Sequence, residues 1–239
     1  MDISDSDLST FGAGPPFYDP RLVPAHGSES ATVFLMNEAP GPAEAEGGIP
    51  LYGAQGGVLF RELRKAGIGW ARNVAIGDGF KWPSKALSRY KSSGPTPANL
   101  RRRDEVLAVR RRVLVCTNAF PYWPRPALDG SGFVKPRMMD VLRPQNVLRL
   151  TKEMAGCRIL LICGEFAMLA CKDRRPKQPA AQEGRELSSV EVGEINSRFG
   201  SKFEFAWYLG HTRRWSLRDH AATLREIGVR AGWKITTPR

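Results

Sequence analysis

The sequence lacks the features of a membrane or secreted protein. No apolar stretch of about 18 residues occurs along its 239 residues, so we expect no transmembrane helix and no membrane partner. The N-terminus has no basic segment followed by an apolar one, and no signal peptide is therefore expected. A cytoplasmic protein is the resulting expectation.

Cysteine and histidine are scarce. The chain has four cysteines and three histidines, and no two cysteines form a C-x-x-C pair. Cys116 and Cys163 lie inside apolar runs, where a thiol acts as a small hydrophobic group. This pattern predicts reduced structural thiols rather than a disulfide or a metal site. No metal is expected.

Positive charge is in excess and unevenly placed. The formal net charge is +12, yet residues 1–30 hold five acidic residues against one arginine. Residues 81–125 hold eleven Lys or Arg against two acidic residues. A concentrated basic region is typical of proteins that bind a polyphosphate such as nucleic acid. A solvated helix face has the same composition, so charge alone leaves both interpretations open.

The order of apolar and polar segments predicts one α/β domain. Residues 1–28, rich in Asp, Ser, Gly and Pro, are expected to form an irregular arm, and residues 29–239 a single domain with a basic insertion around 81–112. Apolar runs predict strands at 31–36, 113–117, 159–163 and 203–209, with a weaker one at 73–76. Helical spacing falls between them at 58–66, 98–112, 146–154, 165–171 and 216–231.

Strands that alternate with helices predict a three-layer α/β/α sandwich around a mainly parallel sheet of four to five strands. In such sheets, functional groups gather beyond the carboxyl ends of the strands. Three polar side chains follow expected strands at this edge: Glu38, Asn118 and His211.

The first of these strands leads into a glycine-rich segment. Residues 37–44 read NEAPGPAE and residues 48–56 read GIPLYGAQG. Glycines let the backbone approach a flat base and a phosphate closely. The segment resembles the first motif of the uracil-DNA glycosylase superfamily and is closest to its family-four branch, G-E-A-P-G-x-x-E…G-x-P-F-V-G-x-A-G. The alternative is an ordinary strand–turn–helix crossover. The resemblance places four residues against the substrate: Ala39, Gly41, Leu51 and Tyr52.

The second motif of that superfamily is a strand ending in Thr-Asn, which residues 113–118 (VLVCTN) resemble. In the family this asparagine reads the Watson–Crick edge of uracil, and an amide offers the donor and the acceptor needed. A Thr-Asn pair also forms ordinary turns. The spacing from Glu38 exceeds that of the family by about forty residues, and Asp78 in 76–83 (IGDGFKWP) is a rival match. We favour Asn118 because its strand is more apolar.

The third motif is a strand ending in His-Pro-Ser, and residues 205–215 (FAWYLGHTRRW) resemble it with Thr212 in place of proline. The resemblance implies that His211 donates a hydrogen bond to uracil O2 as charge builds on the leaving base. Arg213 and Arg214 could bind phosphates of the DNA. Trp215 could insert into the base stack or dock the last helix on the core.

The chain departs from the family-four pattern in ways that bear on cofactor and chemistry. Ala39 stands where family-one enzymes carry aspartate, so no strong aspartate base is expected there. Leu51 replaces the stacking phenylalanine of the family. The iron–sulfur cysteines are missing, and Tyr122 occupies the place four residues after Asn118. No cofactor is therefore expected.

The resemblance implies a DNA glycosylase that flips uracil out of single- or double-stranded DNA and hydrolyses its N-glycosidic bond to start base-excision repair. Glu38 would orient the attacking water, with Glu44 as a reserve carboxylate or a cap for the following loop. The alternatives are a glycosylase of broad specificity for deaminated bases and a protein that binds uracil-DNA without cutting it, or covalently. A monomer is expected, associated with the nucleoid if the protein is bacterial.

The basic helix expected at 98–112 is not explained by the resemblance. Arg101–Arg103 and Arg110–Arg112 lie about two and a half turns apart, so parts of both clusters can share one helix face. Val106, Leu107 and Val109 would then face the sheet. We expect this helix and residues 81–91 to bind the DNA backbone.

Overall fold

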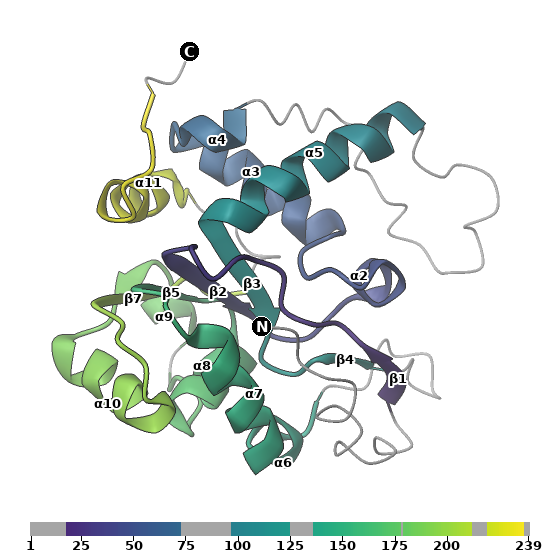
Figure 1. The fold of residues 1–239 in the computed structure, drawn as a ribbon. Helices are drawn as coiled ribbons and strands as arrows, with labels where there is room; N and C mark the ends of the chain where they lie inside the picture. Colours follow the sequence, from purple (N-terminus) through teal and green to yellow (C-terminus); the bar gives the residue numbers. More distant parts are fainter. Residues whose placement is uncertain (1–17, 73–96, 125–135, 178, 212–218, 237–239) are drawn as a thin grey trace.

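The computed structural model describes residues 18–72, 97–124, 136–177, 179–211 and 219–236 (Figure 1). Its centre is a five-stranded sheet in the order β3-β2-β5-β7-β6. Four of these strands are parallel and β6 alone pairs antiparallel, at one edge. The strands are β2 (Val33–Asn37), β3 (Leu114–Asn118), β5 (Ile159–Ile162), β6 (Arg185–Glu186) and β7 (Phe205–Tyr208). The expected mainly parallel sheet is confirmed.

Helices cover both faces of the sheet, an arrangement compatible with the expected three-layer sandwich (Figure 1). The α7 side, as we name it, carries α7 (Pro144–Met154), α8 (Glu165–Lys172) and α10 (Ser189–Phe199). The α3 side carries α3 (Ala54–Lys65) and α11 (Ala221–Arg230), with α5 (Pro97–Val113) above the edge strand β3. Shorter helices complete the described chain: α2 (Pro42–Gly47), α4 (Gly69–Arg72), α6 (Met138–Val141) and α9 (Pro179–Gln182).

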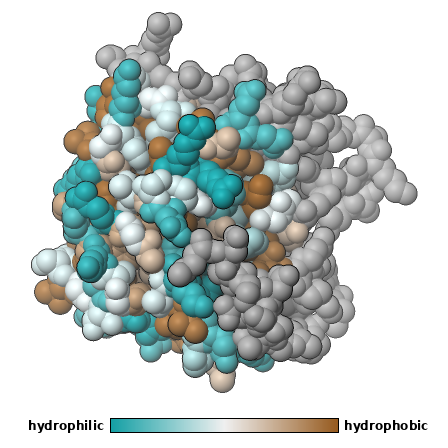
Figure 2. All heavy atoms as spheres, in the orientation of Figure 1, coloured by the Kyte–Doolittle hydropathy of each residue, from teal (hydrophilic) through white to brown (hydrophobic). Residues whose placement is uncertain are grey.

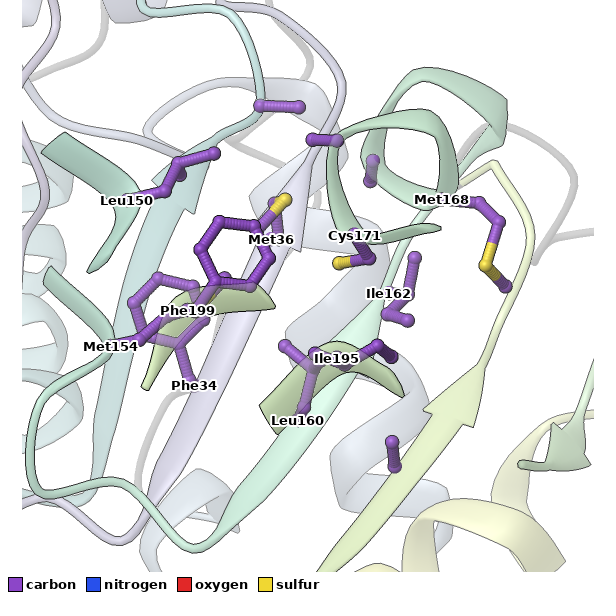
Figure 3. Packing of buried hydrophobic residues seen from close by; sticks show 14 of the residues in the cluster. Phe34, Met36, Leu150, Met154, Leu160, Ile162, Met168, Cys171, Ile195 and Phe199 are labelled. Carbon is purple, nitrogen blue, oxygen red and sulfur yellow. The ribbon is translucent and has the colours of Figure 1, made fainter. Parts of the chain in front are cut away.

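Alternate residues of each strand divide between two apolar clusters, one on each side of the sheet. In β2, Phe34 and Met36 pack on the α7 side against Leu150, Leu160 and other residues drawn in Figure 3. Val33 and Leu35 pack on the α3 side. Burial on both faces explains why β2 and β3 read as nearly continuous apolar runs rather than as alternating ones.

The N-terminal arm is more ordered than its composition predicts. Residues 1–28 were expected to be irregular, but β1 (Tyr18–Leu22) pairs antiparallel with β4 (Tyr122–Pro124) in a second, two-stranded sheet. Further along, the N–H of His26 donates to the Cys116 carbonyl at 2.8 Å. The prediction was wrong for residues 18–28 because these pairings join backbone groups about a hundred residues apart, and local composition does not encode them.

Helix α10 was not predicted, although the sequence carries a signal for it. Ser188 and Glu191 form a reciprocal capping box at its start, in which the Ser188 N–H donates to Glu191 at 2.9 Å. The last helix begins at Ala221, later than the expected residue 216. The weak strand expected at 73–76 lies outside the described residues.

On the face drawn in Figure 2, hydrophobic residues are scattered among hydrophilic ones. Across the described ranges, no helix combines the length and the apolar character that crossing a membrane requires.

Candidate functional site

The three strand ends singled out in the sequence belong to parallel strands of one sheet. Glu38 directly follows β2, Asn118 is the last residue of β3, and His211 follows β7 by three residues. His211 Nε2 lies 3.2 Å from Glu38 Oε2. Asn118 is the register partner of Asn37, the residue before Glu38. The fold thus brings together, at the carboxyl edge of the sheet, groups that are far apart in the sequence.

Glu38 is fixed against the turn that leads from β5 into α8. Its Oε1 accepts the Phe166 N–H at 3.2 Å, at the start of α8. Gly164, in the turn, has φ of 105°, and a Cβ there would lie 2.4 Å from Glu38 Cγ. Glycine is therefore required at 164 both by its backbone conformation and by the carboxylate above it.

The electrostatic surroundings keep Glu38 ionised. Burial on its own would raise the pKa of this carboxyl. The hydrogen bond and charge of His211, with the backbone N–H groups of Phe166 and Glu165, outweigh burial and lower the pKa below its ordinary value. Both side chains keep some contact with solvent, since 19% of Glu38 and 30% of His211 is exposed. The pair can therefore meet a ligand.

Asn118 is fully buried, and neither atom of its side-chain amide has a hydrogen-bond partner among the described residues. Beside it, Asn37 is also buried and donates from Nδ2 to Gln55 Oε1 at 3.0 Å, while its Oδ1 has no partner in the same described ranges. We call the side-chain amides of Asn118 and Asn37, which contain these three atoms, the open amides. A buried polar group without a partner costs about 1–3 kcal/mol, and native proteins tolerate few of them. Such groups are typical of a site that a polar ligand completes.

Sequence reasoning missed Asn37 and Gln55. Only the register of β2 and β3 places the Asn37 side chain on the same side of the sheet as that of Asn118. A signal was present in the sequence, because an asparagine ends each of the two apolar runs.

The glycine-rich segment is held by two buried charged side chains. Glu44 accepts the N–H groups of Gly41, at 2.6 Å, and of Leu51. Arg110, from α5, donates to the carbonyls of Pro50 at 2.8 Å and Leu51 at 3.4 Å. Burial raises the pKa of Glu44 to about 7, against the opposing effects of these N–H groups and of Arg110. Glu44 is thus the cap of this segment and not a reserve catalytic carboxylate, because both its oxygens are used by the backbone.

His26 completes this buried network from the N-terminal arm. Its Nδ1 lies 3.2 Å from Arg110 Nη2. Burial, followed by the charges of Arg110 and Arg111, lowers the pKa of His26 to about 4. The arm, α5 and the glycine-rich segment are therefore tied together by one arginine.

Leu51 does not face a substrate. It has φ of 55°, an unusual conformation for a residue with a side chain, and it packs inside the apolar cluster of the α3 side. The predicted substrate contact is wrong for this residue, because the left-handed backbone conformation turns the side chain into the core. Tyr52 is half-buried, and its ring lies against Gly47. Ala39 is half-buried beside the core of the α7 side, and Gly41 precedes α2.

The basic helix is oriented differently from the prediction. Arg110 is buried, whereas Val109, expected to face the sheet, is 37% exposed. Leu107 is buried as expected. Arg111 and Arg112 are exposed, but they directly precede β3 and so lie at its amino end, opposite to Asn118. Arg110 is therefore not part of an exposed arginine face, because its guanidinium turns inward to the carbonyls of residues 50–51.

Several predicted residues lie outside what the structure describes. These are Asp78, the rival to Asn118, and the segment that holds Thr212, Arg213, Arg214 and Trp215. The side chains of Arg101–Arg103 and Val106 are likewise outside the described set. The burial and the open amide of Asn118 support the preference for Asn118 over Asp78.

All four cysteines are buried and unpaired, as expected of structural thiols. Burial raises the pKa of Cys157 and of Cys171 to about 12, so both stay protonated at neutral pH. Within the described part of the chain, no three His, Cys, Asp or Glu side chains converge as metal ligands would.

The sequence matches no protein-family model and no curated protein.

Proposed function

We propose that this protein is a uracil-DNA glycosylase, which extrudes uracil from DNA and hydrolyses its N-glycosidic bond. One observation carries the proposal. An ionised carboxylate, Glu38, and an imidazole, His211, lie 3.2 Å apart at the sheet edge where Asn118 presents an open amide. A base-excision site needs these three functions: a group that reads the base, a donor to the departing base, and an acceptor for water.

Asn118 supplies the reading of the base. Uracil has a carbonyl, O4, next to the N3–H group. The Asn118 amide has the complementary pair, with Nδ2 as donor and Oδ1 as acceptor. Thymine has the same edge, so its exclusion has to come from the space around its methyl group. Cytosine has a donor in place of O4 and an acceptor in place of N3–H, and so opposes the amide at both positions.

His211 supplies stabilisation of the leaving base. When the glycosidic bond breaks, its electron pair goes to uracil N1 and the negative charge spreads to O2. The protonated ring has an N–H on each nitrogen, so in that form His211 can donate to Glu38 with one and to O2 with the other. A single donor placed where charge develops is worth about 3 kcal/mol of activation free energy.

Glu38 supplies the acceptor for water. Because its pKa is lowered, the carboxylate is ionised at neutral pH and can accept a proton. The water oxygen bonds to C1′ of the sugar as uracil leaves, and the water proton passes to Glu38. The Glu38 carboxylate also offers a negative group to the cationic sugar.

A second function has support from the same carboxylate. Both oxygens of Glu38 are already engaged, Oε1 by the Phe166 N–H and Oε2 by His211. That engagement weakens Glu38 as an acceptor for water and favours a protein that binds uracil-DNA without hydrolysis, or through a covalent bond to the sugar. The core position of Leu51 favours a third variant, a glycosylase of broad specificity for deaminated bases, because no leucine side chain restricts the base there.

The experiment is an excision assay with purified protein. Labelled single- and double-stranded oligonucleotides that contain one uracil, hypoxanthine, xanthine or thymine are incubated with protein and treated with alkali, which cleaves at abasic sites. Cleavage at uracil and not at thymine supports the proposal. Cleavage at the deaminated purines supports broad specificity, and a slow-migrating band on a denaturing gel supports covalent capture. No product and no retained DNA on any substrate would refute all three.

A further inference from the structure

The carboxyl end of β3 is held from behind by one buried arginine. Arg149, on α7, donates from Nη2 to the Asn118 carbonyl at 2.7 Å and from Nη1 to Thr117 Oγ1 at 3.0 Å. The same Nη2 lies 3.4 Å from the Ala119 carbonyl. One guanidinium therefore contacts three consecutive residues, and the middle one is Asn118.

Arg149 reaches the backbone of Asn118 and not its side chain. Val115 and Ala119, which come before and after Asn118 in the sequence, pack in the cluster of the α7 side. Cys116, two residues earlier, packs on the α3 side, and strand alternation directs the Asn118 amide to that side as well. Arg149 thus holds the strand end on one side of the sheet while the open amide lies on the other.

A second amide reinforces this contact. Asn146, one turn before Arg149 on α7, accepts its Nε at 3.1 Å and its Nη2 at 2.9 Å. Asn146 Nδ2 then donates to the carbonyls of Ala119 and Val141, both at 2.7 Å. The strand end, α6 and α7 are linked in this way through a single planar array of donors.

The charge of Arg149 is balanced within the protein. Nη1 lies 2.8 and 2.7 Å from the two oxygens of Glu153, and only 4% of each side chain is exposed. A buried ion pair is a poor source of net stability, so its presence points to a demand for geometry. The fixed fork of a guanidinium reaches several acceptors in one plane, which the single ammonium of a lysine cannot do.

We propose that Arg149 is a positioning residue for Asn118: it fixes the strand end so that the Asn118 amide is presented to the base in one orientation. This inference rests on the proposed glycosylase function. An amide without hydrogen-bond partners is held only by the packing around it and by the backbone that carries it. Arg149 supplies that constraint without touching the substrate.

The test is a double-mutant cycle. Arg149→Met should lower the single-turnover rate of uracil excision by at least about tenfold, since small misplacements of a binding group are costly. In an Asn118→Ala background the same substitution should lower the rate by less than about twofold, because the group it positions is gone. Equal losses in the two backgrounds would overturn the inference and leave Arg149 a purely structural residue.

The controls separate positioning from general destabilisation. Arg158 also binds a glutamate, Glu204, at 2.7 Å, but it is exposed and precedes β5 at the amino edge. Arg158→Met should leave the rate unchanged in both backgrounds. Arg149→Lys keeps the charge but loses the fork, and it should lose excision almost as Arg149→Met does. If Arg149→Met does not fold, Arg149→Lys carries the cycle, and full activity of that variant would overturn the inference.

A spectroscopic readout keeps this test distinct from that of the proposed function. The side-chain NH₂ signals of Asn118 are assigned by their loss in Asn118→Ala. They should form one sharp pair in the wild type and in Arg158→Met, and split or broaden in Arg149→Lys. If the wild type excises no uracil but the signals respond as expected, the proposed function fails and the positioning role stands. Unchanged signals together with normal excision would remove the positioning role alone.

Discussion

Two buried asparagine amides lie on opposite sides of the sheet at the end of β3, and they differ in their hydrogen bonding. On the α7 side, the buried amide of Asn146 binds two backbone carbonyls and a guanidinium. On the α3 side, the buried amide of Asn118 is open. The amide of Asn146 is hydrogen-bonded within the protein, whereas the amide of Asn118 is left for a ligand.

The contrast shows how a stable fold can contain a buried polar group that lowers its free energy of unfolding. An open amide lowers the free energy of unfolding, whereas a saturated network opposes any rearrangement that would close it. Placing the two back to back keeps Asn118 from finding a partner within the protein. Ligand-binding groups often lack hydrogen-bond partners until the ligand binds. In this pair, the amide of Asn118 lowers the free energy of unfolding, and the hydrogen-bonded network of Asn146 opposes rearrangement of the strand that carries it.

The strongest way to break the comparison is to make the same substitution on both sides. Asn146→Leu leaves two carbonyls and part of Arg149 without partners, and should lower the free energy of unfolding by about 3 kcal/mol or more. Asn118→Leu removes an open amide and should raise it by about 1 kcal/mol. Denaturant unfolding measures both. Equal signs for the two variants would show that Asn118 is satisfied in solution and that the contrast does not exist.

A second test of the comparison uses Glu44, a buried side chain that can carry a charge. Its pKa of about 7 in the folded protein lies above its ordinary value of 4.5, so the folded state binds a proton that the unfolded state does not between these pH values. The resulting stabilisation is complete below pH 4.5 and disappears as pH rises through 7. Glu44→Gln cannot titrate. Relative to this variant, the wild type should lose about 1.4 kcal/mol per pKa unit of the shift on going from pH 4.5 to 8. A constant difference across that range would mean that the pKa of Glu44 is not raised.

His211 tests whether the open side is catalytic. His211→Ala should slow single-turnover excision by about tenfold or more, equal to about 1.4 kcal/mol, and leave DNA affinity nearly unchanged because it acts on charge that develops in the transition state. The matched control is His220→Ala, since that histidine is a buried residue directly before α11 and should affect thermal stability rather than rate. Loss of DNA affinity in His211→Ala without loss of rate would place His211 outside the chemistry.

The smallest effect is expected from the exposed arginines at the far end of β3. If Arg111 and Arg112 bound phosphates, changing both to glutamine would flatten the slope of log K against log salt by about 0.9 for each contact. Because they lie at the amino end of the strand, we expect a change below about half a unit for the pair. A larger change would place DNA across this end as well and would restore the role first expected for the basic helix.

The sequence predicts the parallel part of the sheet well because each of its four parallel strands is an apolar run buried on both faces, and such runs are local signals. It also predicts that Glu38, Asn118 and His211 follow strands, since strand ends are local too. It does not predict that Arg110 is buried, because the carbonyls that hold it belong to residues 50–51, about sixty positions away. The same limit applies to Arg149.

Only the fold shows how close Glu38 and His211 lie to each other. Parallel order alone places Glu38 and His211 at one edge, but β5 separates their strands. Contact between the two side chains depends on the long reach of glutamate across the turn at Gly164. Leu51 failed as a prediction for a similar reason, since a positive φ at a residue other than glycine leaves no mark in the sequence.

The packing of Glu38 on Gly164 sets a rule for how related sequences can diverge. A second pair repeats the arrangement on the adjacent strand, because a Cβ at Gly210 would lie 2.3 Å from Glu183 Cγ. In each pair the acidic side chain occupies the space that a Cβ at the glycine would need, so the glycine cannot change while the glutamate stays in this position. Homologues that keep glutamate at 38 should keep glycine at 164, and the positive φ at 164 favours glycine there even where residue 38 is shorter. These two coupled pairs give a signature for finding distant relatives that overall similarity does not reveal.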